Sequence, residues 1–365
     1  MKALRRMMTA AALAVAVLTG GAALAADPVT ITYGYHPYWT GGWSGVIIKS
    51  KELWKKYLPE GSQVHFEAHL TGPPMVNALL ADKMQIGTMG DMPSLVATTR
   101  RDIGDVRLAS VVMFSPGQQC NKLLVARDAP DFTSVEEAAA WISEGPIAVH
   151  RGTCTNRFVE SLIEKQVLAP TEVLNMSIEV IASNFEAGQL RAAAMWEPHA
   201  RRVVEAGYAK YAATGAPWGE NDASFTVMRQ DFIENNPEAA AGWIKAEIEA
   251  LKFIAENPAE TAEILAAELT GYSALTAWAA IYEKNPAAIG GAEINYVAPV
   301  LFDEAVLALM RDGYAFLNRI QVVPSPDMPE NAYNDGPARQ ALEELGLTAP
   351  VGTIVGIERA EAPFQ

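Results

Sequence analysis

The sequence predicts an α/β protein of two lobes with a cleft between them. Strand-like runs alternate with helical runs, as in folds built on largely parallel sheets. Two similar β-runs, 121–128 and 224–232, bracket one self-contained α/β block, which places one lobe as an insertion in the other and links the lobes by two crossings. The roughly 340 residues after residue 25 exceed what one core usually holds. Ligands of such sheets bind at the carboxyl ends of the strands.

The first 25 residues have the pattern of a secretory signal peptide. Basic residues (Lys2, Arg5, Arg6) precede the apolar run Ala10–Leu18, and Ala23-Leu24-Ala25 is a cleavage signal. The apolar run is too short for a transmembrane helix. Removal of this segment takes the formal net charge from −15 to −18, because it carries three basic residues and no acidic one. A chain this acidic is a poor partner for nucleic acid or an anionic membrane surface, so we expect neither.

The first part of the chain supplies four strands and the helices between them. We predict strands at 29–35, 62–70, 84–88 and 107–114, and helices at 46–57, at 75–80 and from Pro93 onward. VTITYGY (29–35) alternates and is rich in β-formers, as a first strand should be. The remaining strands follow the same signals.

The stretch MQIGTMGDMPSLVATT (84–99) carries a strand into a helix through a glycine turn. Asp91 fits the N-cap of that helix, and Pro93 suits its first turn. A helix N-terminus carries partial positive charge and free N–H groups, so it binds anions readily. We therefore place one part of a ligand site at Gly90, Asp91 and Met92, mainly through the backbone.

The middle of the chain repeats the alternation. We predict strands at 121–128, 146–150, within 173–181 and at 224–232, and helices at 133–144, from Thr155 and on both sides of a strand within 184–207. Ser134 and Glu137 have the spacing of a capping box. After Asn236-Pro237 the chain is mainly helical to about Leu317, and the tail is rich in proline. The predicted division is signal peptide 1–25, first lobe 26–122 and 225–330, inserted second lobe 123–224, and tail 331–365.

The loop HPYWTGGWSG (36–45) follows the first strand and is the richest candidate for a binding loop. Its aromatic residues have few core partners at a strand end, and its glycines let backbone N–H groups approach a ligand. A glycine-rich loop with core aromatics is the alternative. The candidates from this loop are His36, Trp39, Thr40, Gly41, Gly42 and Trp43.

A corresponding junction in the second lobe is RGTCTNRF (151–158). The hydroxyls of Thr153 and Thr155, with Cys154 at a helix N-terminus, would form an oxyanion cradle. Arg157 lies one turn into that helix and either reaches the same anion or lies on a solvated face.

The two cysteines, Cys120 and Cys154, have the spacing of no metal motif, and we expect no metal site. Export permits a disulfide between them, and two buried free thiols are the equal alternative. The sequence has no GxSxG, HExxH or Walker-type loop. A Cys154 pair with His150 or His36 is a weak basis for an enzyme, because nothing orients the base.

Three ordered segments resemble the nitrate/sulfonate/taurine group of solute-binding proteins that serve ABC importers. They are GDMPSL (90–95), GQLRAAAMWEP (188–198) and VMRQDFIENNPE (227–238), and their order fits nearly the whole mature chain. Arg191 stands where the family often has Asp, and the 36–45 loop is more aromatic than is typical. The second departure means that the family's usual ligands should not be assumed.

The resemblance implies a type II periplasmic binding protein fold, a periplasmic location, no catalysis and no cofactor. It implies that Trp196 and Glu197 reach the cleft, where Glu197 would favour a ligand with an amino group unless it pairs with Arg201. The ligand would be a small anionic or zwitterionic solute, with a flat or cationic part suggested by Trp39, Trp43 and Trp196. The expected partners are ABC permease subunits in the inner membrane, and we expect a monomer. A secreted enzyme of this fold acting on a small heterocycle, or a ligand-sensing interaction module, is the alternative.

Overall fold

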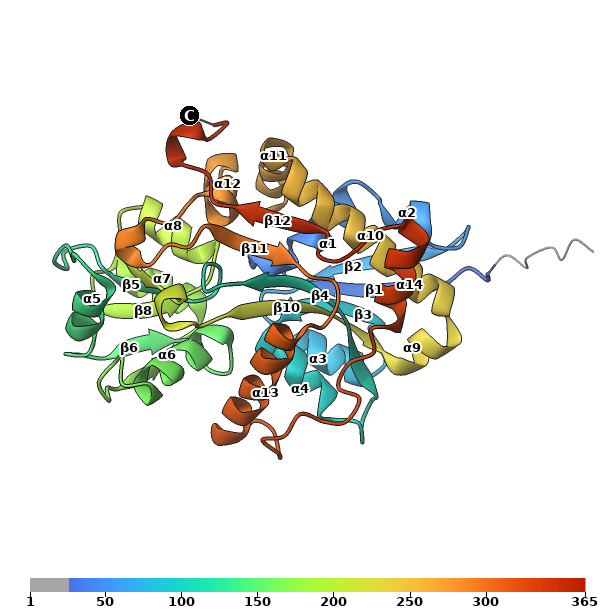
Figure 1. Cartoon of the computed structure of the whole chain (residues 1–365), viewed down its shortest axis with the longest axis horizontal. Helices are drawn as coiled ribbons and strands as arrows, with labels where there is room; N and C mark the ends of the chain where they lie inside the picture. Colours follow the sequence, from blue (N-terminus) through green and yellow to red (C-terminus); the bar gives the residue numbers. More distant parts are fainter. Residues whose placement is uncertain (1–25, 365) are drawn as a thin grey trace, which may run out of the picture.

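The computed structural model describes residues 26–364, in which the chain forms two α/β lobes (Figure 1). The predicted signal peptide, 1–25, lies outside the described residues. One lobe is built on a seven-stranded sheet and the other on a five-stranded sheet among these residues. The two-lobed α/β fold expected from the sequence is thereby confirmed.

The larger sheet combines strands from the beginning, middle and end of the chain. Its order is β12 (Gly352–Val355), β11 (Ile294–Ala298), β4 (Val106–Ser115), β10 (Asp222–Arg229), β3 (Ile86–Gly90), β1 (Thr30–Tyr35) and β2 (Gln63–Ala68). The central strands β3, β4 and β10 are buried on both faces, so their polar side chains, such as Ser110 and Thr226, are buried as well.

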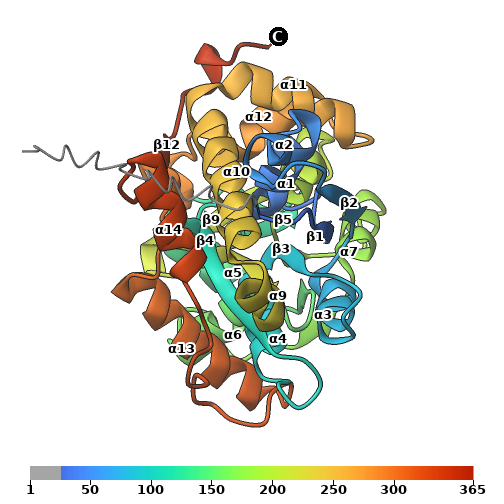
Figure 2. The ribbon, with the colours of Figure 1, turned by 90° about the vertical axis from the view of Figure 1, so that its right-hand side faces the viewer.

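Helices cover both faces of this sheet. One face is covered by α1 (Trp43–Ser50), α2 (Trp54–Tyr57), α10 (Pro237–Glu256), α11 (Pro258–Glu268) and α14 (Gly336–Leu345) (Figure 2). The other face is covered by α3 (Gly72–Leu80), α4 (Asp91–Thr98) and α13 (Glu304–Arg319). The short helix α9 (Gln230–Asn235) directly follows β10. Trp43 and Trp243 pack with Tyr33 in the first core layer, and Leu95 packs with Met310 in the second. The alternation of side chains along each strand produces the two layers.

The smaller sheet is formed by the middle of the chain. Its order is β7 (Val173–Asn175), β6 (Ile147–Val149), β8 (Ala192–Met195), β5 (Lys122–Ala126) and β9 (Ala209–Thr214). Its helices are α5 (Val135–Ile142), α6 (Cys154–Glu164), α7 (Ile178–Glu186) and α8 (His199–Glu205). The capping interaction at Ser134 is present, because its side chain accepts the N–H of Glu137.

The chain passes from the larger to the smaller sheet between β4 and β5 and returns between β9 and β10. Figure 1 shows these passages side by side in the middle of the molecule. The helix α12 (Ala274–Tyr282) lies against α8 and extends the larger lobe along the smaller one.

Two expectations about the sheets are wrong. Both sheets are mixed, because β10 runs antiparallel to β3 and β4, and β5 runs antiparallel to β8 and β9. A strand that returns from the other lobe enters its sheet from the opposite end, which reverses its direction. The strands β9, β11 and β12 also lie in stretches where we predicted no strand.

None of the helices within residues 26–364 combines the length and apolar character that crossing a membrane requires.

Candidate functional site

A cavity of about 320 Å³ lies between the two lobes. Its walls come from the loop after β1, the beginnings of α3, α4 and α6, the residue after β8 and the segment after α13. Its lining residues are His36, Trp39, Thr71, Gly72, Pro73, Val76, Asn77, Gly90, Asp91, Pro93, Val96, His150, Arg151, Gly152, Thr153, Cys154, Trp196 and Val322.

Three helices begin at the cavity wall, and none has a side chain that caps it from the N-cap position. The N-cap residues of α3, α4 and α6 are Thr71, Gly90 and Thr153. The α3 terminus is weakened as a donor, since Pro73 and Pro74 have no N–H. The α6 terminus has no acidic residue in its first turn and presents an uncompensated positive end to the cavity.

The α4 terminus differs, and the expected N-cap at Asp91 is wrong: Gly90 is the N-cap and Asp91 is the first residue of the helix. Asp91 Oδ1 accepts the N–H of Met92 at 2.8 Å, and Oδ2 lies 4.0 Å from Nη2 of Arg157 on α6. Burial raises the pKa of this carboxyl, and the Arg157 charge opposes the rise. The Asp91–Arg157 pair bridges the lobes, but Asp91 Oδ2 accepts no hydrogen bond among the described residues, so a buried acceptor remains at this wall.

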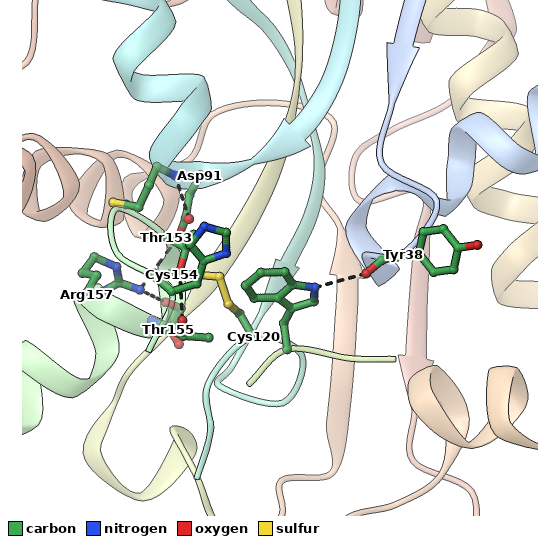
Figure 3. The surroundings of a disulfide bond; sticks show 11 residues. Tyr38, Asp91, Cys120, Thr153, Cys154, Thr155 and Arg157 are labelled. Carbon is green, nitrogen blue, oxygen red and sulfur yellow. Dashed lines mark hydrogen bonds and ion pairs between the residues drawn. A yellow bond between two sulfur atoms is a disulfide. The ribbon is translucent and has the colours of Figure 1, made fainter. Parts of the chain in front are cut away.

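The α6 terminus is fixed by hydrogen bonds around a left-handed glycine. Gly152 has φ +75°, and the space where its Cβ would lie is open to at least 4 Å. Thr153 Oγ1 donates to the His150 carbonyl at 2.6 Å and lies 2.9 Å from Thr155 Oγ1. Cys154 forms a disulfide with Cys120, with Cα atoms 6.1 Å apart (Figure 3). The disulfide ties the cavity end of α6 to the segment that crosses between the lobes.

The loop after β1 contributes His36 and Trp39, both of which are buried. Neither His36 Nδ1 nor Trp39 Nε1 has a hydrogen-bond partner among the described residues. Burial, and then repulsion from His150 and His69, lowers the pKa of His36 to about 3, so its imidazole is neutral. A Cβ at Gly90 would lie 3.7 Å from Trp39 Nε1, which places the indole donor at the cavity wall.

Trp196 forms the opposite wall and is held on three sides. Its ring stacks on His150 at 5.9 Å and meets His36 edge-on at 6.3 Å. Its Nε1 donates to the Tyr38 carbonyl at 3.1 Å (Figure 3). Burial also lowers the pKa of His150. The wall is therefore rigid, aromatic and uncharged.

The structure brings seven of the predicted site residues together at the cavity. They are His36, Trp39, Gly90, Asp91, Thr153, Cys154 and Trp196. The other eight do not line it: Thr40, Gly41, Gly42, Trp43, Met92, Thr155, Arg157 and Glu197.

Trp43 and Met92 belong to the cores instead. Trp43 is fully buried, and its Nε1 donates to the Pro37 carbonyl at 2.8 Å. Met92 is equally buried in the layer under α4. Both residues point from a loop–helix junction toward the sheet, and the sequence pattern gives no direction at such a junction.

The glycines of the first loop serve the packing of the loop itself. A Cβ at Gly41 would lie 2.6 Å from Trp39 Nε1, and one at Gly42 would lie 2.3 Å from the His36 carbonyl oxygen. Thr40 is buried, and its N–H donates to the Glu197 carbonyl at 3.2 Å, which adds a contact between the lobes.

Glu197 and Arg157 are engaged by protein groups. Glu197 Oε1 accepts from the Tyr211 hydroxyl at 2.6 Å, and Oε2 accepts the N–H of Arg201 at 2.9 Å. The Arg201 guanidinium lies 3.3 Å from Glu283, so the alternative side-chain pair with Glu197 is absent. Arg157 donates to Glu220 at 3.3 Å and to the Asn221 carbonyl. Thr155 is buried behind Thr153.

Sequence reasoning missed His150, Arg151, the α3 residues and Val322 as lining residues. The run Thr71-Gly72-Pro73-Pro74 is a strand–helix junction like the others, so its position was accessible to the same argument. Val322 follows α13 and carries no such signal.

The Cys154–His pair considered for catalysis has no free thiol, because both cysteines are in the disulfide. Within residues 26–364, no group of three or more His, Cys, Asp or Glu could hold a metal ion.

Comparison with known proteins gives one family and several related structures. The model of the NMT1-like family matches residues 25–269. A putative aliphatic sulfonates-binding protein of Bacillus subtilis is 22% identical over 60% of this chain. The match covers 65% of that relative, so the chain spans just under two thirds of its length.

Solved structures share the fold at lower identity. The alkanesulfonate-binding protein of Xanthomonas axonopodis pv. citri, bound to MOPS, matches with a TM-score of 0.65 and 18% identity over 85% of this chain and 99% of that one. The periplasmic nitrate-binding protein of Synechocystis PCC 6803 matches with a TM-score of 0.67 and 14% identity, over 91% of this chain and 94% of that one. The desulfurization enzyme DSZB matches with a TM-score of 0.60 and 15% identity, over 87% of this chain and 99% of that one. At these identities the likeness concerns the fold.

Proposed function

This chain belongs to the NMT1-like family, and we propose that it is the periplasmic solute-binding component of an ABC importer. In this role it captures a small anionic or zwitterionic solute and delivers it to permease subunits in the inner membrane. The predicted signal peptide supports the location, and the sulfonate- and nitrate-binding proteins of similar fold support the role.

The observation that carries the proposal is the uncapped N-terminus of α6 at the inter-lobe cavity. Thr153 and Cys154 N–H groups and the helix dipole supply positive potential there, and such ends bind oxyanions. The nearby Trp39 Nε1 is a buried donor without a partner among the described residues. An oxyanion in the cavity would satisfy these donors together.

Lobe closure follows from the same geometry. The cavity walls belong to both lobes, so a ligand contacts both at once. A ligand that binds the closed form better than the open form shifts the population toward closure. Delivery then requires only that the permease favour the open form.

The experiment is a thermal-shift screen of the purified mature protein with nitrate, methanesulfonate, benzenesulfonate, taurine and benzoate. A ligand at 100 times its Kd stabilises the folded state by about 2.7 kcal/mol, which moves Tm measurably. We expect at least one of these anions to raise Tm. No shift with any of them would contradict the proposal, and mass spectrometry of the mixtures would reveal turnover if the chain were instead an enzyme.

A matched pair of variants makes the screen specific for α6. Thr153→Asp places a carboxylate at the helix N-cap, where Asp is favourable for folding but repels an anion in the cavity. Thr153→Asn has a similar size and capping ability without the charge. Anion binding should be lost in the first variant and retained in the second, while both remain folded. Equal affinity in both would place the anion elsewhere.

A further inference from the structure

Asp91 is a buried carboxyl whose hydrogen bonds are incomplete. Its side chain is 1% exposed, and it is the one carboxyl among the described residues that line the inter-lobe cavity. Oδ1 accepts the Met92 N–H, but Oδ2 has no hydrogen-bond partner among the described residues. A buried polar atom in this state costs free energy, and a charged oxygen costs more than a neutral one. A donor from a ligand in the cavity would remove that cost.

The neighbouring guanidinium of Arg157 does not supply this donor. Its Nη2 lies 4.0 Å from Asp91 Oδ2, which is beyond hydrogen-bond distance. The Arg157 guanidinium donates instead to Glu220 and to the Asn221 carbonyl. Burial, and then the nearby Asp91 charge, raises the pKa of a second buried carboxyl, Asp222, to about 8. Two carboxyls thus lie close together beside one shared guanidinium, and this end of the cavity is short of a cation.

The positive end of the cavity lies close to this carboxyl. The α6 terminus at Thr153 and Cys154 presents free N–H groups there, and Arg151 lines the same wall. Arg157, which faces Asp91, follows Cys154 by three residues, or about 4.5 Å along the helix axis. A ligand that uses both ends must therefore carry its cation within a few bonds of its anion.

The rest of the cavity wall is largely apolar. Pro73 and Val76 of α3 and Pro93 and Val96 of α4 line it beside two indole rings. A cavity of about 320 Å³ leaves room for a side chain next to the charged groups of a ligand. An apolar side chain that covers this surface would be removed from water, which favours binding.

We infer that the ligand is a zwitterion of the amino-acid type, whose ammonium group donates to Asp91 Oδ2. Its oxyanion lies at the α6 terminus, and its apolar side chain lies against the valines of α3 and α4. This inference rests on the proposed function and narrows its solute class. Asp91 takes the role expected of Glu197, whose oxygens accept from Tyr211 and the Arg201 N–H. Apolar α-amino acids such as leucine and phenylalanine are the simplest members of this class.

Calorimetric titration of the parent protein tests the ligand class. L-Phenylalanine and L-leucine are compared with 3-phenylpropanoate and 4-methylpentanoate, which lack only the ammonium group, and with glycine, which lacks the side chain. We expect at least one of the two amino acids to bind at least tenfold more tightly than its deaminated analogue and than glycine. Equal or tighter binding of the deaminated analogues would overturn the ammonium contact, and equal binding of glycine would overturn the apolar one.

The same titrations separate this inference from the proposed function. If nitrate or a sulfonate binds while neither amino acid does, the inference fails and the proposed function stands. If no anion and no zwitterion binds, both fail.

Asp91→Asn then tests the contact itself. Asparagine keeps an oxygen for the Met92 N–H but has no negative charge, so the amino acid should lose at least tenfold in affinity. Its deaminated analogue should bind unchanged or more tightly. Glu220→Gln removes the carboxylate on the other side of Arg157, outside the cavity lining, and as the control it should leave the ratio of the two affinities unchanged. An equal loss for both ligands in Asp91→Asn would show a structural role for Asp91 and overturn the inference.

Discussion

Trp196 Nε1 donates a hydrogen bond to the Tyr38 carbonyl across 3.1 Å, and this bond joins the two lobes beside the cavity. Thr40 N–H donates to the Glu197 carbonyl at 3.2 Å, two residues further along the first loop. The loop after β1 is thus fastened to the segment after β8 by two bonds. Both bonds run between the lobes, so they stabilise the arrangement of the lobes that encloses the cavity.

We predict that Trp196→Phe weakens ligand binding without unfolding the protein. Phenylalanine keeps an aromatic ring against His150 but has no N–H for Tyr38. A hydrogen bond of this kind contributes about 0.5–1.5 kcal/mol net, so calorimetry should show a loss of affinity of roughly two- to tenfold. Trp141→Phe, which changes a tryptophan on α5 away from the cavity, is the control. Identical affinities for Trp196→Phe and the parent protein would show that the bond does not favour closure.

Trp39 and Trp43 lie four residues apart, but replacing them should have different effects: the Trp39 change should mainly weaken ligand binding, and the Trp43 change should mainly lower stability. Trp39 Nε1 has no partner among the described residues, whereas Trp43 Nε1 donates to Pro37 within the core. Trp39→Phe loses buried volume but no hydrogen bond, so it should lower the free energy of unfolding less than Trp43→Phe does. It should also weaken anion binding, because a bond to a charged group contributes about 1.5–3 kcal/mol. Trp43→Phe should lower the free energy of unfolding by about 1 kcal/mol and barely affect affinity.

Urea unfolding and calorimetry on both variants separate these outcomes. A stability loss in Trp39→Phe equal to that in Trp43→Phe would mean that the Trp39 indole has a structural partner. Unchanged anion affinity in Trp39→Phe would remove this side chain from the site.

The sequence predicted the strand–helix junctions well and the direction of individual side chains poorly. The strands near 29–35, 62–70 and 107–114 are present, because β-branched and aromatic runs between turn residues leave few alternatives. The strand β9, AKYAAT, was missed because it has few β-formers, and its pairing with β5 decides its conformation.

In the candidate site, too, the positions of the strand–helix junctions were predicted better than the directions of the side chains. Gly90, Thr153 and Trp196 were found at the cavity because each lies at, or shortly after, the carboxyl end of a strand. Glu197 was misassigned because its direction depends on Tyr211, which is 14 residues away in the sequence and whose contact no local pattern reveals. Val322 depends on the path of the chain after α13, which packing determines.

The disulfide between Cys120 and Cys154 should couple stability to ligand binding. It closes a loop with a sequence separation of 34 residues, for which chain entropy gives about 3–4 kcal/mol. Cys154 also lines the cavity, so we expect reduction to lower Tm and to weaken anion binding. Thiol titration of the denatured, unreduced protein should find no free thiol. Two titratable thiols would contradict the bond.

A final prediction concerns Glu247, a fully buried carboxyl on α10 between β4 and β10. The hydroxyls of Ser110 and Thr226 donate to it, yet burial raises its pKa to about 7. The folded state therefore keeps a proton that the unfolded state, with an ordinary glutamate pKa near 4.3, has already released. The free energy of unfolding should fall as pH rises through this window and change no further from this group above about pH 7.

Glu247→Gln removes that dependence while preserving size and hydrogen-bonding capacity. Relative to the parent protein, the variant should gain stability between pH 4.5 and 7.5 by an amount on the order of 3 kcal/mol. Burial also raises the pKa of Asp222 to about 8. Asp222 contributes equally to the pH dependence of the free energy of unfolding in both proteins, so its contribution cancels when the two are compared. Glu238→Gln, on the exposed first turn of the same helix, is the control and should show no such gain. Parallel curves of unfolding free energy against pH for Glu247→Gln and the parent would mean that Glu247 is ionised in the folded protein at neutral pH.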